Sequence, residues 1–146
     1  MLAIMIDPLS YLPGYVLRRA SIATMGRLHT HLGPHGLRAT EASLILLIGE
    51  RSGLTQSDAG RILGIKRANM APLTAKLELR GLVRRVQLNG RSQELALTPE
   101  GALMLEKVRS VIDMHEAETM ARLPADLRPY VIPILAAIWG PDSQES

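Results

Sequence analysis

The sequence predicts a mainly α-helical fold with one small β-sheet of two or three strands. The chain of 146 residues is 47% hydrophobic but only 3% aromatic, and it contains no Cys, a composition that disfavours β-rich and disulfide-stabilised folds. Apolar residues recur at helical spacing over most of its length. One Asn-Gly pair separates two short alternating runs, the pattern of a β-hairpin. The length suits a single domain over residues 1–146.

Two helices are predicted in the first third of the chain. The first runs from Tyr11 to Leu32, with Pro13 in its first turn, where the missing N–H is not needed. A Gly/Pro-containing loop follows. Thr40 is then the expected N-cap of a second helix over residues 41–50, whose nearly continuous apolar run indicates burial.

The next segment predicts a helix-turn-helix. Thr55 and Asp58 have the spacing of a capping box at the start of a short helix over residues 56–63. Gly64 ends that helix, and Gly81 is the natural C-cap of the basic helix that follows. Two helices joined by a short glycine-containing turn form this motif.

Pro72 lies inside the second, basic helix of this motif. If that helix began at Arg67, the proline would remove a backbone hydrogen bond to Ala68, at a cost of about 3 kcal/mol. With Asn69 as the N-cap, Pro72 would instead lie in the first turn, where no such bond is lost. The sequence therefore predicts a late start, or a kink, near Asn69.

Residues 82–97 predict the hairpin. Asn89-Gly90 favours a two-residue type I′ turn, because Asn and Gly tolerate the positive φ that this turn requires. That turn sets a register with Arg85 opposite Glu94, a favourable cross-strand charge pair. The same register places four apolar residues on the inward face: Leu82, Val86, Leu95 and Leu97.

The remainder of the chain predicts two more helices. Thr98-Pro99-Glu100 has cap, proline and acid in the preferred order for a helix start. This helix can continue to about Arg122, before Pro124 interrupts it. A last apolar helix over residues 125–139, ADLRPYVIPILAAIW, then ends near Gly140.

Positive charge is concentrated in residues 61–91. The segment holds eight Lys or Arg residues against Glu78 alone, whereas the whole chain has a formal net charge of only +3. Such asymmetry suits a surface that binds phosphate, although a solvated basic face is the commoner explanation of a charge run taken by itself. Together with a helix-turn-helix and a hairpin carrying arginine at its tip, it indicates a winged helix, whose second helix enters the major groove while the wing reaches the backbone.

The residues also resemble the MarR family of regulators. The resemblance is carried by LTQSDAGRILGIKRANMAPLTAKLELRGLVRR, by the wing NGRSQELALTPEG and by the long helices on both sides. The wing signature of the family is Asp-x-Arg followed by residues like LTPEG, so the wing arginine of the family maps to Arg91. Asn89 stands where the family has Asp.

This resemblance implies a homodimeric repressor. A location in the cytoplasm is expected because residues 1–13 do not have the pattern of a signal peptide or a membrane anchor. Helices at about residues 8–33 and 99–140 would form the dimer interface, around a DNA-binding lobe at about residues 37–98. The dimer would bind a pseudo-palindromic operator in double-stranded DNA. A small ligand, often a phenolic or aromatic acid or an acyl compound, would release it.

Two sets of candidate site residues follow. Asn can read adenine and Arg can read guanine, and the Ala71 and Pro72 positions leave room for apolar contact with thymine methyl groups. The expected DNA-binding residues are Lys66, Arg67, Asn69, Met70, Lys76, Arg84, Arg85, Asn89 and Arg91. The ligand candidates are Tyr11, Tyr15, Arg18, Arg19, Met25, His29 and Met114, for which ordinary core or interface packing is an equal alternative.

Other kinds of site are not expected. His29 and His31 point to different sides of a helix and His35 lies in a loop, so no metal site is predicted. No nucleophile set, glycine-rich phosphate loop or acid pair has catalytic spacing, so neither an enzyme nor a cofactor is predicted. The apolar residues 1–13 lack the features of a signal peptide and are too short to span a membrane. Two alternatives stay open: a DNA-binding architectural or constitutive regulator without a ligand, and a winged-helix module that binds proteins.

Overall fold

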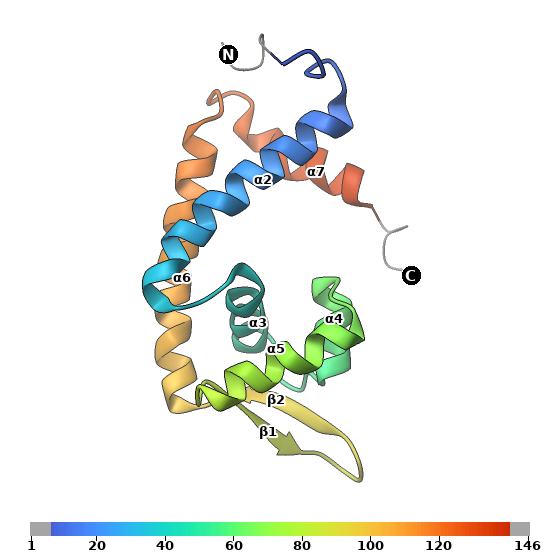
Figure 1. The fold of residues 1–146 in the computed structure, drawn as a ribbon, viewed down its shortest axis with the longest axis vertical. Coiled ribbons are helices and arrows are strands. Elements are labelled where there is room, and N and C mark those ends of the chain that lie inside the picture. Colours follow the sequence, from blue (N-terminus) through green and yellow to red (C-terminus); the bar gives the residue numbers. More distant parts are fainter. Residues whose placement is uncertain (1–6, 141–146) are drawn as a thin grey trace.

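The fold is known from a computed structural model, which describes residues 7–140. It is mainly helical and contains a two-stranded antiparallel sheet, as the sequence predicts. Two long helices, α2 and α6, connect an end formed by α7 with an end formed by α3, α4, α5 and the hairpin (Figure 1). The elements in chain order are α2 (Pro13–Leu32), η1 (Gly33–His35), α3 (Ala39–Glu50), α4 (Gln56–Leu63), α5 (Arg67–Leu79), β1 (Val83–Gln87), β2 (Gln93–Leu97), α6 (Pro99–Ala121), η2 (Arg128–Tyr130) and α7 (Val131–Trp139).

The first two helices occupy nearly their predicted positions. Helix α2 starts at Pro13, which takes the first helical position. The predicted N-cap of α3 is wrong, because this helix starts at Ala39 and Thr40 already lies within it. The carboxylate of Glu41 accepts the Arg38 backbone N–H at 2.9 Å and so caps the first turn from inside the helix.

Helix α4 has the predicted bounds and the predicted capping box. The Thr55 hydroxyl accepts the Asp58 N–H at 3.1 Å, and the Asp58 carboxylate accepts the Thr55 N–H at 3.2 Å. These hydrogen bonds lower the pKa of Asp58. Gly64 ends α4 in the left-handed region, at φ 66°.

Helix α5 does not start late, so the first alternative predicted at Pro72, a late start near Asn69, is wrong; the second, a kink, stays a prediction. Lys66 is its N-cap, Arg67 is its first residue, and Pro72 lies in its interior. Both Pro72 and Ala68 are exposed, so water can reach the Ala68 carbonyl that lacks its usual donor. Met70, Thr74 and Leu77 are buried on the other side of the helix, and this packing stabilises an uninterrupted helix despite the proline.

The hairpin forms, but its predicted register is wrong by one residue. Val83 pairs with Leu97 and Arg85 pairs with Leu95. The Leu88 N–H donates to the Ser92 carbonyl at 2.8 Å, which leaves three residues in the turn, 89–91. Only Gly90 of these has positive φ, at 75°, so the type I′ turn cannot form. Arg85 therefore does not face Glu94, and Val86 lies on the opposite face from Leu95 and Leu97.

The sheet has two strands plus one isolated bridge. Thr55, just before α4, bridges to Glu94, and the Leu95 N–H donates to the Leu54 carbonyl at 2.7 Å. This contact joins the base of the wing to the start of the helix-turn-helix. The inward face of the sheet contributes Val83 and Leu95 to the core.

The C-terminal helices follow the predicted order. Helix α6 runs from Pro99 to Ala121, close to the predicted end at Arg122. The last helix, α7, is shorter than predicted, because residues 128–130 form a separate 3₁₀ turn before it. Within the described part of the chain, no helix is both long and apolar enough to cross a membrane.

The main hydrophobic core joins the ends of α2 and α6 to the helix-turn-helix. Its members come from α2 through α6 and include Leu32, Leu44, Ile45, Leu77 and Val108. No residue of α7 belongs to this core, and none of its side chains is buried. The division of the chain into a DNA-binding lobe and dimerisation helices stays a prediction.

Candidate nucleic-acid interface

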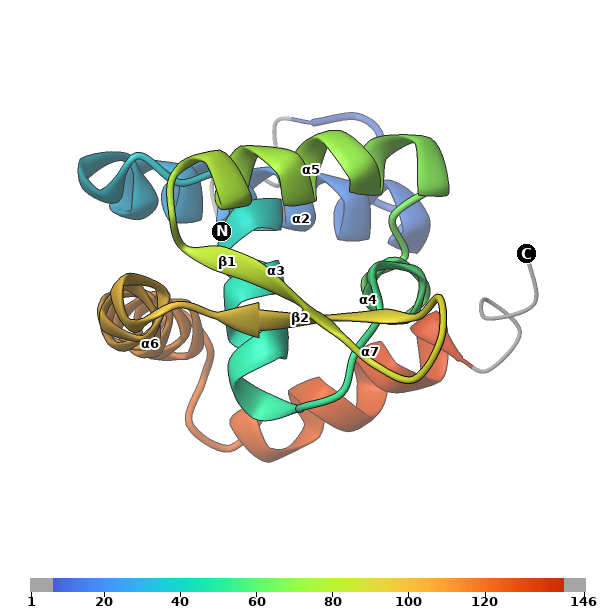
Figure 2. The ribbon, with the colours of Figure 1, turned by 90° about the horizontal axis from the view of Figure 1, so that it is seen from below.

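The two helices of the helix-turn-helix and the wing surround one open cavity. Its volume is about 700 Å³. Figure 2 looks onto this end of the molecule, where α5 lies beside the hairpin. Basic side chains from α4, α5 and the wing line the cavity: Arg61, Lys66, Arg67, Arg85 and Arg91.

Four of the eight basic residues in residues 61–91 have partners within the protein. Arg61 pairs with Asp58 at 2.6 Å, and Arg80 donates to the backbone carbonyls of His35 and Gly36 at 3.2 and 2.8 Å. Lys76 and Arg85 pair with Glu41 and Glu78. Within residues 7–140 the side chains of the other four make no hydrogen bond or ion pair: Lys66, Arg67, Arg84 and Arg91. These four cations are free to meet an external anion.

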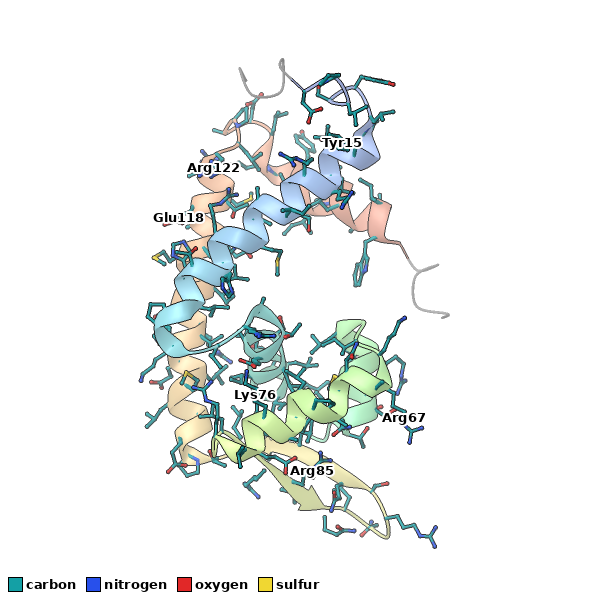
Figure 3. All side chains as sticks on the ribbon, in the orientation of Figure 1. Tyr15, Arg67, Lys76, Arg85, Glu118 and Arg122 are labelled. Carbon is teal, nitrogen blue, oxygen red and sulfur yellow. The ribbon has the colours of Figure 1, made fainter. Side chains whose placement is uncertain are left out.

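The residues predicted to contact base edges lie at the start of α5. Lys66, Arg67 and Asn69 are all exposed around its first turn, and Arg67 extends outward from the helix start (Figure 3). Asn69 lies on the side away from the large cavity and lines a smaller one of about 360 Å³ together with Thr40. The unsatisfied N–H groups of this first turn add a further attraction for anions.

Met70 lines the large cavity, but almost none of its side chain is accessible for the predicted DNA contact. Its side chain is buried, with 1% of its area exposed, in the core between α4 and α5. The two helices approach so closely that a Cβ at Gly60 would lie 2.8 Å from the Met70 Cγ. The apolar side chain is therefore a packing residue.

Lys76 also has a structural partner that the prediction missed. Its ammonium group lies 2.6 Å from the carboxylate of Glu41, which is 2% exposed, and Figure 3 shows Lys76 directed from α5 toward α3. Burial by itself would raise the pKa of Glu41, but the hydrogen bonds from Lys76 and from the Arg38 backbone outweigh it and lower that pKa. The ion pair of Lys76 with Glu41 therefore links α5 to α3.

Replacing Glu41 by glutamine is expected to destabilise the protein at pH 7 by about 1–3 kcal/mol, the range for hydrogen bonds to charged groups. Because folding lowers the pKa of Glu41, its contribution is complete above the ordinary value of 4.5 and is lost as the pH falls below it. Urea unfolding from pH 7 to pH 3 should show the difference between wild type and E41Q shrinking.

The exposed pair of Glu50 and Arg109, 2.9 Å apart, gives a matched control. E50Q should change stability by less than about 0.5 kcal/mol at any pH in that range. An E41Q effect that is as small as that of E50Q, or that does not change with pH, would contradict the role of Glu41.

The three arginines of the wing have different surroundings. Arg85 donates to Glu78 and to Gln56, both at 2.7 Å, so it joins the wing to α5 and α4. Arg84 is exposed on the other face of the hairpin. Asn89 and Arg91 are exposed in the turn. Arg85 is therefore a support of the wing, while Arg84 and Arg91 remain open to solvent.

The supporting residues could not be found from the sequence. Glu41, Gln56 and Glu78 each anchor a basic side chain that the charge pattern assigned to the DNA-binding set. They are separated from their partners by 7 to 35 residues in the chain. Only the position of Glu41 in the first turn of a helix gave any local signal.

The candidate ligand residues line neither of the two cavities described above. Tyr11, Arg18, Arg19, Met25, His29 and Met114 are exposed along α2, before it, and on α6. The Tyr15 hydroxyl donates to the Asp7 carboxylate at 2.6 Å, which lowers the pKa of Asp7 and raises that of Tyr15. Both cavities described above lie beside the helix-turn-helix, and no residue of α2 or α6 lines either of them.

The histidines of α2 and α6 form a polar contact between these helices. His31 pairs with Glu118 at 2.9 Å, and the buried His115 makes a hydrogen bond of 3.2 Å with the Thr24 hydroxyl. Among residues 7–140, no group of three or more potential ligand side chains could hold a metal ion.

Comparison with known proteins decides the family. Residues 35–92 match the sequence profile of the MarR family. The transcriptional repressor CouR, whose structure is known bound to a 23-mer DNA duplex, is 30% identical to this chain. The alignment covers 91% of this chain and 96% of CouR, with a TM-score of 0.84.

The chain belongs to the MarR family of winged helix-turn-helix transcriptional regulators. This assignment confirms the predicted family and fold class and places the chain in a non-enzymatic family. Similarity extends to the HTH-type transcriptional repressor Rv2887 of Mycobacterium tuberculosis, which is 27% identical over 114 residues. That alignment covers 77% of this MarR chain and 82% of Rv2887.

Solved structures of relatives also contain small molecules. CouR from Rhodococcus jostii RHA1 has been solved with p-coumaroyl-CoA; it is 26% identical, and the alignment covers 92% of this chain and 96% of CouR with a TM-score of 0.81. Rv2887 has been solved with salicylic acid; it is 25% identical, and the alignment covers 86% of this chain and 95% of Rv2887 with a TM-score of 0.70.

Proposed function

We propose that the protein is a dimeric transcriptional repressor that binds a pseudo-palindromic operator and is released by a small aromatic or acyl ligand. In each protomer, α5 enters the major groove and the wing follows the backbone beside it. The proposed DNA contacts are Lys66, Arg67, Asn69, Arg84, Asn89 and Arg91. Arg85, Lys76 and Met70 support this surface from within the protein.

The observation that carries this proposal is the distribution of unpaired cations. Lys66, Arg67, Arg84 and Arg91 lack an internal partner within the described residues, and they come from the start of α5 and from the wing. A basic cavity of about 700 Å³ lies between these elements. Phosphate groups of a duplex would neutralise these side chains, and CouR, with the same fold, is known bound to DNA.

The apolar surface of α7 supports the proposal of a homodimer. Its nine residues include Ile132, Ile134 and Ile138, which are 76%, 57% and 61% exposed. A contiguous apolar helix left in water is unfavourable, and a large exposed apolar surface of this kind marks a site of association. A second copy of α7, together with exposed Ile22 and Met25 of α2, gives a self-complementary interface of the kind that a two-fold dimer requires.

Ligand control rests on the relatives and on the position of α2. The compounds bound by CouR and Rv2887 combine an aromatic ring with a carboxylate or an acyl thioester. Arg18 and Arg19 could pair with a carboxylate, and Tyr11, Tyr15, Met25, His29 and Met114 could line an apolar site that the partner protomer helps to close. A ligand that favours one separation of the two α5 helices would shift the dimer away from operator spacing.

Replacing Arg67 or Arg91 by alanine is expected to weaken operator binding about 30-fold or more. Each replacement removes one contact from each protomer, and such contacts are worth about 1–3 kcal/mol. If Arg91 meets a phosphate, R91A should also reduce the slope of log affinity against log salt by about 2, one for each protomer. Fluorescence anisotropy over a salt series measures both effects.

Arg109 gives a control arginine outside this surface. It lies on α6 and pairs with Glu50, so R109A should leave affinity and salt slope unchanged. Thermal unfolding would verify that all three variants are folded. Wild-type operator affinity in both R67A and R91A would contradict the proposed interface.

A further inference from the structure

The exposed side of α5 has an unusual composition for a recognition helix. Met70, Thr74 and Leu77 hold this helix to the core. Since residues three or four apart lie on one face of a helix, the residues on the opposite side are Ala68, Pro72, Ala75 and Leu79. All four are exposed, and Leu79 is 90% exposed. We call these four residues the apolar face of α5.

The apolar face has no side chain that can donate or accept a hydrogen bond. Pro72 also lacks a backbone N–H. Arg67 and Asn69, both in the first turn of α5, are exposed and make no side-chain hydrogen bond or ion pair among the described residues. Lys76, further along the helix, is also exposed but pairs with Glu41. Hydrogen-bonding readout of bases by this helix is therefore confined to its start.

Cationic groups border this face. Lys66 and Arg67 precede it, and Arg91 lies across the basic cavity in the wing. None of the three has a partner among the described residues. A second copy of the same face would bring like charges together, whereas a polyanion would neutralise them, so charge complementarity selects DNA as the occupant of the apolar face.

We propose that α5 reads its half-site chiefly through the C5-methyl groups of thymine. This inference rests on the proposed function and names the class of DNA sequence that it requires. The thymine methyl is the one apolar group that the four bases display in the major groove, and alanine side chains are suited to contact it. Ala68, Pro72 and Ala75 make these contacts, while Arg67 and Asn69 add hydrogen bonds at one end.

The spacing of these residues sets the length of the readout. A rise of 1.5 Å per residue separates Ala68 from Ala75 by about 10.5 Å along the helix axis, which corresponds to about three base pairs at about 3.4 Å each. Each half-site should therefore contain two or three thymines within about three base pairs under the middle of α5. A cytosine methylated at C5 would replace one of these thymines as an apolar contact.

Substitution of deoxyuridine for thymine tests this directly, because uracil keeps the hydrogen-bonding groups of thymine and lacks only the methyl group. In an operator defined by footprinting, each thymine is replaced in turn and affinity is measured by anisotropy. We expect a loss of about fourfold for each methyl group under α5, the value of one buried CH₂ group. Deoxyuridine outside the α5 footprint should have no effect.

A protein variant separates readout from folding. P72G leaves no side chain at this position and restores a backbone N–H within α5, and glycine is less unfavourable than proline in a helix interior, so the variant should remain folded. At one thymine the penalty for deoxyuridine should fall toward unity in P72G, while the penalties at distant thymines remain. If α5 made no contact with thymine methyl groups, replacing residue 72 could not change the deoxyuridine penalty at one thymine alone.

Two outcomes would overturn the inference, and only the second would also overturn the proposed function. If the operator binds tightly and every deoxyuridine substitution changes affinity less than twofold, methyl readout is wrong but the repressor function is untouched. If no DNA binds more tightly than a scrambled duplex, the proposed function fails and the inference fails with it.

Discussion

Replacing Gly101 by alanine should destabilise the protein by about 3 kcal/mol or more, at the upper end of the range for overpacking. Gly101 is the third residue of α6, and its N–H donates to the Thr98 hydroxyl at 2.9 Å. An added Cβ would lie 1.9 Å from the carbonyl oxygen of Leu82. That oxygen already accepts the Thr98 N–H at 3.1 Å, so the backbone cannot withdraw without breaking the junction between wing and α6.

Gly14 provides a matched control for this substitution. It is the second residue of α2, follows a proline at the helix start as Gly101 does, and has no atom within 4 Å of an added Cβ. G14A should leave stability unchanged or raise it slightly. Urea unfolding of both variants measures the difference. Equal stability of G101A and G14A would contradict the close packing of α6 against the start of β1.

Replacing Ile138 by aspartate should convert the proposed dimer into a monomer and weaken operator binding at least 100-fold. Ile138 is 61% exposed on α7, and its burial by a partner would contribute about 1.5–3 kcal/mol in each protomer. An unpaired carboxylate in the same place would oppose association strongly. The loss of operator affinity follows because a monomer holds only one half-site at a time.

Leu103, 63% exposed near the start of α6, is the matched apolar control because it lies at the wing end of that long helix (Figure 1). L103D should remain dimeric and keep its operator affinity. Sedimentation equilibrium gives the oligomeric state, and circular dichroism verifies that I138D is folded. A dimeric I138D protein with wild-type affinity would show that α7 is not the interface.

Local sequence patterns predicted most of the fold. The α4 capping box depends only on Thr55 and Asp58, three residues apart, and it forms as expected. Pro13 and Pro99 likewise mark two helix starts, because the fixed φ of proline and its missing N–H act within one turn. Such signals are reliable because each depends only on residues within the first turn of the helix.

The wrong predictions concern places where tertiary contacts outweigh local preference. The burial of Met70, Thr74 and Leu77 keeps α5 helical through Pro72. The Asn89-Gly90 pair favours a two-residue turn in isolation, but pairing of Val83 with Leu97 at the base of the hairpin fixes a three-residue turn. In the observed register Arg85 is not opposite Glu94, and its guanidinium group donates to Glu78 and Gln56 instead.

The candidate site was predicted in outline rather than in detail. Charge concentration correctly indicated the start of α5 and the wing as the basic surface. It could not distinguish Lys66, Arg67, Arg84 and Arg91 from Lys76 and Arg85, because all are basic and only their partners differ. Those partners, such as Glu41 for Lys76, are distant in sequence and meet only in the folded chain.

The most direct test of the repressor proposal is fluorescence anisotropy on the DNA upstream of the protein's own gene and on a scrambled duplex, over a series of salt concentrations. We expect binding to the upstream DNA to be at least about 10³-fold tighter at physiological salt, the range of specific DNA-binding proteins. Equal affinities for the two duplexes, both falling steeply with salt, would mean that phosphate attraction is the only interaction, and would contradict a sequence-specific repressor.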